Sequence, residues 1–100
     1  MNPELKQKWL EALRSGKYKQ GTGLLRSKEN YFCCLGVLCD IIDNKKWEIT
    51  NSGDYCYEKS TVAPTSSSII REGAIGHLMT LNDEAKSSFA EIADWIEGNL

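Results

Sequence analysis

A nearly uninterrupted apolar segment at residues 33–42 constrains the fold most. It reads Cys-Cys-Leu-Gly-Val-Leu-Cys-Asp-Ile-Ile, with Asp40 as its one charged residue. A segment of this kind is either a buried strand or a buried helix. Its ten residues exceed the usual strand, and Leu35 and Leu38 favour helix, so we predict a central buried helix. Asp40 must then lie at a helix end, be paired or be hydrogen-bonded, because burying a bare carboxylate costs too much free energy.

An amphipathic helix is predicted at the start of the chain. Residues 2–4, Asn-Pro-Glu, are typical of a helix start, and the pair Ser15-Gly16 is typical of a helix end. The apolar residues between them recur at helical spacing: Leu5, Trp9, Ala12 and Leu13.

A second amphipathic helix is predicted at the other end of the sequence. Ser88 and Glu91 have the spacing of a capping box. An apolar stripe follows and is prolonged by Leu100: Phe89, Ile92, Ala93 and Ile96. Trp95 lies off this stripe, so we expect it to be partly exposed.

Short strands and turns are predicted between these helices. Residues 17–32 favour a hairpin-like pair of strands with a polar turn at 27–30, and residues 47–57 favour a second hairpin. Gly21-Thr22-Gly23 is interpreted as a turn or bulge, since two glycines alone do not make a phosphate-binding loop. Residues 60–68 are expected to be a surface connection. A short helix at 69–74 should be ended by Gly73 and Gly76, and Asn82-Asp83 should form a turn or cap.

These elements together predict a single domain over residues 1–100. Helix, hairpin, helix, hairpin, short helix and helix follow one another, which indicates an α+β fold with helices packed on a small antiparallel sheet. A formal net charge of −2 argues against general nucleic-acid binding, which depends on neutralising phosphates. The sequence has no apolar run near the ~20 residues that a membrane span needs, and its first ten residues do not resemble a signal peptide.

The cysteines are interpreted as reduced core residues of a cytoplasmic protein. The four are Cys33, Cys34, Cys39 and Cys56. Adjacent cysteines point in different directions and the chain has no CxxC pair, so neither a metal site nor a cofactor is predicted. His77 is the only histidine, and it is interpreted as a loop or packing residue rather than a base. Asp40 and Asp83 are the carboxylates considered for acid–base work, and each has a structural explanation. We therefore predict no catalytic residues and no enzyme.

Seven residues are candidates for binding a nucleotide-like ligand. Cations suit phosphate and flat rings suit a base, so Arg26 beside the glycine bend and Trp47 are included. Asn82 and Asp83 can recognise ribose hydroxyls or an adenine edge. The full set is Gln20, Gly21, Arg26, Asp40, Trp47, Asn82 and Asp83. The alternatives remain open: Arg26 as a solvated strand-end residue, Trp47 with Tyr55 and Tyr57 as cross-strand packing, and Asn82-Asp83 as a cap.

Three stretches resemble a family of small proteins common in phage and prophage genomes. They lie at residues 6–16, at 32–40 with the string Phe-Cys-Cys-Leu-Gly-Val-Leu-Cys-Asp, and at 81–83 with 88–97, where Leu-Asn-Asp and Ser-Phe-Ala-Glu-Ile-Ala-Asp-Trp-Ile-Glu occur. Residues 43–76 depart from the pattern. The resemblance implies a small accessory protein made in the cytoplasm of an infected bacterium, of the kind that counters host defences.

Two functions from different classes follow from this context. One is a non-catalytic homo-oligomer that sequesters a nucleotide-derived immune signal, either a cyclic nucleotide or an ADP-ribose derivative. The other is a module that binds and inhibits a host protein, using an exposed Trp9 or Trp95 and an acidic face formed by Glu91, Asp94 and Glu97. Sequestration predicts that Arg26→Ala abolishes function in a folded protein, and host-protein binding predicts the same for Trp95→Ala.

Overall fold

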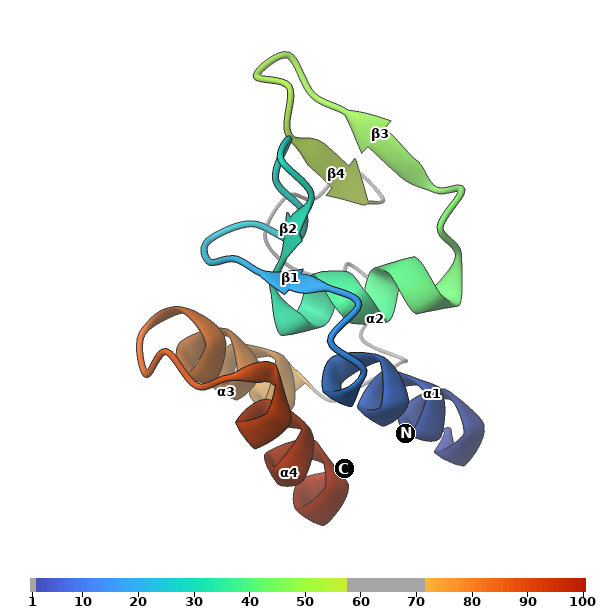
Figure 1. Cartoon of the computed structure of the whole chain (residues 1–100), viewed down its shortest axis with the longest axis vertical. Helices are drawn as coiled ribbons and strands as arrows, with labels where there is room; N and C mark the ends of the chain where they lie inside the picture. The colour runs from blue at the N-terminus through green and yellow to red at the C-terminus, as the bar shows by residue number, and fades with distance from the viewer. Residues whose placement is uncertain (1, 58–71) are drawn as a thin grey trace.

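Four helices form most of the described structure. The computed structural model describes residues 2–57 and 72–100. The helices in these ranges are α1 (Pro3–Arg14), α2 (Cys34–Ile42), α3 (Glu72–Asp83) and α4 (Phe89–Asn99). α1 and α3 each pack against both α2 and α4, and Figure 1 shows α2 between the other helices and the strands. The predicted α+β class is confirmed. None of the described helices is long and apolar enough to cross a membrane.

Local capping fixes the starts of α1 and α4, as the sequence predicts. Asn2 Oδ1 accepts hydrogen bonds from the Glu4 and Leu5 amides at 2.8 and 3.0 Å. Ser88 and Glu91 form the complete capping box, in which each side chain accepts from the other's backbone N–H. These bonds satisfy N–H groups that have no partner inside a helix.

The central segment is the predicted buried helix. Cys33 caps α2, and the first six residues of this helix are buried. Trp9 of α1 is fully buried and donates from Nε1 to the Cys34 carbonyl at 2.9 Å. Gly36 faces Leu25 so closely that an added Cβ would collide with the Leu25 carbonyl oxygen. The glycine in the first turn of the helix therefore lets a loop backbone pack directly on it.

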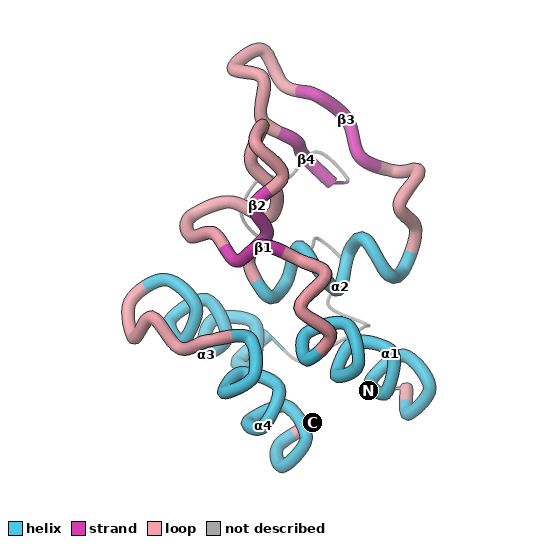
Figure 2. Tube along the Cα trace, in the orientation of Figure 1, coloured by secondary structure: helices cyan, strands magenta, loops and turns pink. Residues whose placement is uncertain are grey.

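The strands form two short pairs (Figure 2), and one residue bridges both pairs. β1 (Lys19–Gln20) pairs in parallel with β2 (Tyr31–Phe32), and β3 (Trp47–Ile49) pairs antiparallel with β4 (Tyr55–Tyr57). The backbone of Arg26 makes antiparallel bridges to Phe32 and to Tyr55. Arg26 therefore lies between the two pairs and connects them.

The structure corrects the first predicted hairpin. The turn at residues 27–30 is present, with the Asn30 amide donating to the Ser27 carbonyl at 2.9 Å, but the strand returning from it is β2 and its antiparallel partner is only Arg26. The loop between β1 and Arg26 bonds to α3 and packs against α2. A continuous strand from β1 to Arg26 cannot satisfy these contacts, so β1 joins β2 from the other side, in parallel.

The structure also corrects the predicted end of the third helix. α3 continues through Gly73 and Gly76 to Asp83, so Asn82 and Asp83 lie in its last turn and not in a loop. Each glycine costs a helix about 1 kcal/mol, but burial of Ala74 and Leu78 offsets that cost. The predicted connection at 60–68 and the predicted helix start at 69 lie outside the described residues.

Candidate functional site

The seven predicted site residues separate into two groups. Four of them lie where the loop after β1 meets the end of α3: Gln20, Gly21, Asn82 and Asp83. The other three lie among aromatic rings on the strands: Arg26, Asp40 and Trp47. We call the first group the amide network. We call the rings around the second group the aromatic cluster; they belong to Tyr18, Phe32, Trp47, Tyr55 and Tyr57. Strands β1 and β2 link the amide network to the aromatic cluster. The Gly21 amide donates to the backbone carbonyl of Phe32, whose side chain belongs to the aromatic cluster.

Asn82 is the centre of the amide network. Its side chain is 1% exposed. Its Oδ1 accepts from Gln20 Nε2 at 3.0 Å and from the Cys34 amide at 3.2 Å. Its Nδ2 donates to the Gly21 carbonyl and to Asp83 Oδ1, both at 2.8 Å. These four bonds use the full capacity of a primary amide. Asn82 therefore ties α3, α2 and the loop after β1 together.

Asp83 occupies the position that an anion would take at the glycine bend. Its Oδ1 accepts from the Gly23 amide at 3.1 Å, and Gly23 has a φ of +82° that favours glycine. A Cβ at Gly21 would lie 2.7 Å from Tyr31 Cβ, so close strand approach requires that glycine. The bend thus binds the protein's own carboxylate, in agreement with its interpretation as a structural turn.

A pocket opens beside the amide network. It has a volume of about 390 Å³ and is lined by Gln20, Thr22, Asn82 and Lys86. Gln20 Nε2 is held in place by Asn82 Oδ1 and by the Ser87 carbonyl, the latter at 2.8 Å. The lining thus offers amide and hydroxyl groups and one ammonium. The sequence analysis missed Thr22 and Lys86.

Lys86 follows α3 in an uncommon backbone conformation. Its φ is +53°, in the left-handed region that disfavours side chains with a Cβ. The Ser87 amide donates back to the Leu81 carbonyl at 2.9 Å, so the chain folds back onto the last turn of α3 through Lys86. No local sequence pattern marks this conformation, because it belongs to the turn that connects α3 to α4.

The aromatic cluster is a chain of edge-on ring contacts. Tyr18 contacts Phe32 with ring centroids 5.0 Å apart, and Phe32 contacts Trp47 at 6.2 Å. Trp47 also contacts Tyr55 and Tyr57 at 6.2 and 5.1 Å. Such geometry places the positive edge of one ring against the negative face of another. The cross-strand packing interpretation of these aromatics is confirmed, and a role in stacking on a base stays a prediction.

Arg26 lies against this cluster with its charged group over the rings. Its guanidinium carbon is 3.9 Å from the Tyr55 ring centroid and 5.2 and 5.5 Å from those of Phe32 and Trp47. Nε and Nη2 both donate to Asn30 Oδ1, at 2.9 and 2.7 Å. The cation is thus stabilised by ring faces and a neutral amide.

Asp40 satisfies its carboxylate through two side chains of the aromatic cluster. Tyr18 donates from its hydroxyl to Oδ2 at 2.7 Å, and Trp47 donates from Nε1 to Oδ1 at 3.0 Å. The requirement that Asp40 be hydrogen-bonded is therefore confirmed. Burial, and then the bond to Asp40, raise the pKa of Tyr18 to about 12.

Comparison with known proteins identifies a family. Residues 1–66 match the model of a domain of unknown function, DUF8296. The chain belongs to this family. The DUF8296 match includes the whole aromatic cluster and the bend of the amide network, whereas Asn82, Asp83 and Lys86 lie beyond it. No curated protein and no solved structure matches the chain.

The cysteines of this DUF8296 member serve as packing residues. Cys33, Cys34 and Cys39 are buried, as predicted, and Cys56 on β4 is partly exposed. Burial raises the pKa of Cys33 to about 11 and that of Cys34 well above its usual value. Both thiols therefore stay protonated at neutral pH. Within the described residues, no three His, Cys, Asp or Glu side chains are grouped closely enough to hold a metal ion.

The tryptophans proposed for host-protein binding differ in position. Trp9 is fully buried, in agreement with its place in the predicted apolar stripe of α1, so it does not provide the exposed tryptophan that host-protein binding requires. Trp95 is half-buried, as predicted, with its ring 4.6 Å from that of His77. His77 lies on α3 and packs there rather than in a loop.

The acidic face of α4 is partly neutralised by α1. Arg14 donates from Nη2 to Asp94 Oδ1 at 2.8 Å and to Glu97 Oε1 at 2.6 Å. All three side chains remain substantially exposed. These pairs link the first and last helices and reduce the net negative charge of that face.

Proposed function

We propose that this protein binds a small nucleotide-derived anion without transforming it, holding the ligand in the pocket beside the amide network. In the context implied by the family resemblance, the ligand is a cyclic nucleotide or an ADP-ribose derivative. Holding it would withdraw an immune signal in the cytoplasm of a phage-infected bacterium. The observation that carries the proposal is Lys86, a lysine that lines a polar pocket and has a backbone conformation that favours glycine.

The lysine supports an anionic ligand. A left-handed backbone costs a residue with a Cβ about 1 kcal/mol, and such strain is typical of functional positions. Among the described residues, no carboxylate forms an ion pair with Lys86. Its ammonium is therefore free of a described counter-ion and suits a phosphate as a point charge.

The neighbouring groups support a polar, ribose-bearing ligand. Thr22 supplies a hydroxyl and Gln20 its amide oxygen, because both donors of Gln20 Nε2 already bond to Asn82 and Ser87; these two groups can bond to ribose hydroxyls or to a base edge. A volume of about 390 Å³ lies in the range of small-molecule sites. Asn82 has no capacity left for a direct bond, so its role in this proposal is to hold Gln20 in place.

Substituting the lysine tests the proposal without damaging the fold. The protein would be incubated with a panel of cyclic dinucleotides and of cyclic or conjugated ADP-ribose, then washed on a size filter. Heat would release any retained ligand for mass spectrometry. We expect wild type and Lys86→Arg to retain one panel member intact, and Lys86→Gly to lose at least about tenfold in affinity. Lys86→Gly should melt at the wild-type temperature or slightly above it, because glycine removes the strain.

Each other outcome contradicts a defined part of the proposal. Equal retention by Lys86→Gly and wild type would place the site elsewhere. Release of a chemically altered ligand would show catalysis. Failure of wild type to retain any panel member would reject sequestration of these signals. A host-protein pull-down that depends on Trp95 would then support the competing function.

A further inference from the structure

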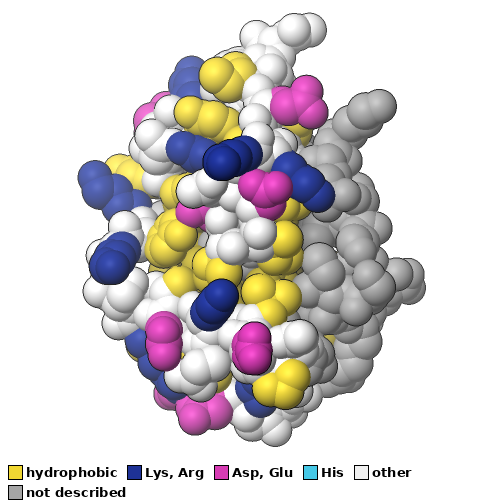
Figure 3. Space-filling model, turned by 90° about the vertical axis from the view of Figure 1, so that its right-hand side faces the viewer, with side chains coloured by type: hydrophobic (Ala, Val, Ile, Leu, Met, Phe, Trp, Pro, Cys, Tyr) yellow, Lys and Arg dark blue, Asp and Glu magenta, His cyan; other side chains and the backbone are white. Residues whose placement is uncertain are grey.

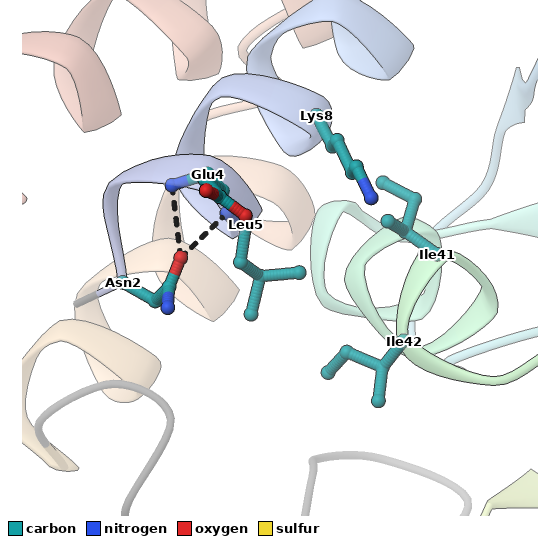
Figure 4. A pocket seen from close by; sticks show the side chains of 6 residues that line it. All are labelled: Asn2, Glu4, Leu5, Lys8, Ile41 and Ile42. Carbon is teal, nitrogen blue, oxygen red and sulfur yellow. Dashed lines mark hydrogen bonds between the residues drawn. The ribbon is translucent and has the colours of Figure 1, made fainter.

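A groove runs along α1 on the side that faces the end of α2. It consists of two adjoining hollows of about 310 and 360 Å³ that share Lys8 and Ile41. Figure 3 shows hydrophobic side chains gathered across this side of the molecule, with basic and acidic side chains beside them. In Figure 4, Leu5 of α1 and Ile42 of α2 face each other across one hollow. Nothing in the proposed ligand site uses this surface.

The floor of the groove is aliphatic and only half covered. Leu5 and Ala12 contribute from α1, and Ile41 and Ile42 contribute from the last turn of α2. Each of these side chains is half-buried and packs on the edge of the core. Covering them would remove further apolar surface from water, which stabilises association.

The charges lining the groove alternate in sign. Glu4 and Lys8 line one hollow, and Lys8, Glu11 and Lys17 line the other. None of these four side chains forms an ion pair with a described residue. The two ion pairs among the described residues both involve Arg14, which does not line the groove. The groove therefore carries two carboxylates and two ammonium groups that no described residue pairs.

The spacing of the exposed residues along α1 is symmetric about the middle of the helix. Residues 4, 8 and 11 of α1 and its C-cap residue, Ser15, form one exposed ridge, because they are separated by four, three and four positions. A two-fold axis between residues 9 and 10 exchanges 8 with 11 and 4 with 15. It would place Lys8 of one copy against Glu11 of the other, twice, and Glu4 near the other copy's Lys17.

We propose that the groove is a homodimer interface, with the α1 helices of two copies antiparallel about this axis. The same patch serves both copies, which is the rule for two-fold interfaces. The aliphatic floor provides most of the stabilisation, because exposed ion pairs contribute little. The charges set the register, because sliding one ridge by a turn brings like charges together.

Charge reversal gives a test with a built-in rescue. Sedimentation velocity would be measured for wild type, Lys8→Glu, Glu11→Lys and an equimolar mixture of the two variants. We expect wild type to dimerise and each variant alone to associate at least about tenfold more weakly, a loss of about 1.4 kcal/mol or more. The mixture should form a heterodimer of near wild-type affinity, because a carboxylate then meets an ammonium group at both contacts between positions 8 and 11. Circular dichroism melts would confirm that both variants are folded, since both side chains are exposed.

Three results would overturn the interface. A wild type that stays monomeric up to millimolar concentration would leave the groove to another occupant, such as a host-protein helix. Variants that dimerise as well as wild type would place the dimer contact on another surface. Folded variants that stay monomeric when mixed would show that Lys8 and Glu11 do not face each other.

Discussion

Asn82 and Arg26 are both polar side chains predicted to bind ligand, and the protein surrounds them differently. Asn82 is buried, and its four hydrogen bonds reach α2, the loop after β1 and its own neighbour Asp83. Arg26 is half-buried, and its guanidinium has ring faces on one side and a single amide oxygen for two of its donors. One group is saturated by the fold, and the other has hydrogen-bonding capacity to spare.

This difference means that Asn82 serves to connect parts of the fold, whereas Arg26 has donors available for further bonds. Removing a saturated buried group leaves its partners without bonds inside the protein, so the cost falls on stability. Removing a half-buried cation lets water reach the groups that it covered, so the cost to stability is smaller. The comparison predicts a descending series of effects on the free energy of unfolding.

Asn82→Ala should have the largest effect. The substitution leaves the Cys34 amide and the Gly21 carbonyl without the side chain that bonds them. We expect the free energy of unfolding to fall by about 3 kcal/mol or more in urea denaturation. The matched control is Gln20→Ala, which removes an exposed member of the same network and should cost about 1 kcal/mol or less. Similar losses for the two variants would contradict the central role of Asn82.

The sequence predicts most of the helical fold because its signals are local. Asn2 and Ser88 start their helices through bonds to residues two or three positions away. The length of α3 could not be predicted in this way. Asn82-Asp83 is typical of a turn, and it remains helical because Asn82 bonds to Cys34 and Gly21, which are distant in the chain. Tertiary contacts of this kind leave no local pattern.

The candidate site was predictable only in part, for the same reason. The cost of burying a carboxylate shows that Asp40 needs partners, but only the fold shows that they are Tyr18 and Trp47. A glycine bend beside Arg26 suggests a phosphate site, yet Asp83 fills the bend. Lys86 carries no local signal, because its conformation belongs to the turn that connects α3 to α4.

Arg26→Ala should have an intermediate effect on stability. It removes three ring contacts and two bonds to Asn30, so we expect a loss of about 1–2 kcal/mol in the same denaturation experiment. Arg26→Lys keeps the charge without the planar group and should recover only part of that loss. Ligand retention should persist in both variants if the ligand binds at Lys86. A folded Arg26→Ala protein that retains no ligand would instead assign the phosphate contact to Arg26, as the sequence suggested.

Tyr18→Phe should have the smallest effect at neutral pH and the clearest dependence on pH. The variant loses one partly exposed bond to Asp40, which still accepts from Trp47, so we expect a cost of about 1 kcal/mol. Burial and the Asp40 bond raise the pKa of folded Tyr18 from 10.0 to about 12, so the unfolded chain releases this proton first as pH rises. Folding therefore retains a proton that the unfolded state has lost, and wild-type stability falls across this window.

The advantage of wild type over Tyr18→Phe should be fully present below pH 10.0 and disappear as pH rises through about 12. Urea denaturation of both proteins at a series of pH values measures this difference directly. The subtraction cancels the other tyrosines and the lysines, which titrate in both proteins. A difference that stays constant across this range would mean that neither burial nor the bond to Asp40 raises the pKa of Tyr18. The contribution of Tyr18 to stability would then come from the packing of its ring alone.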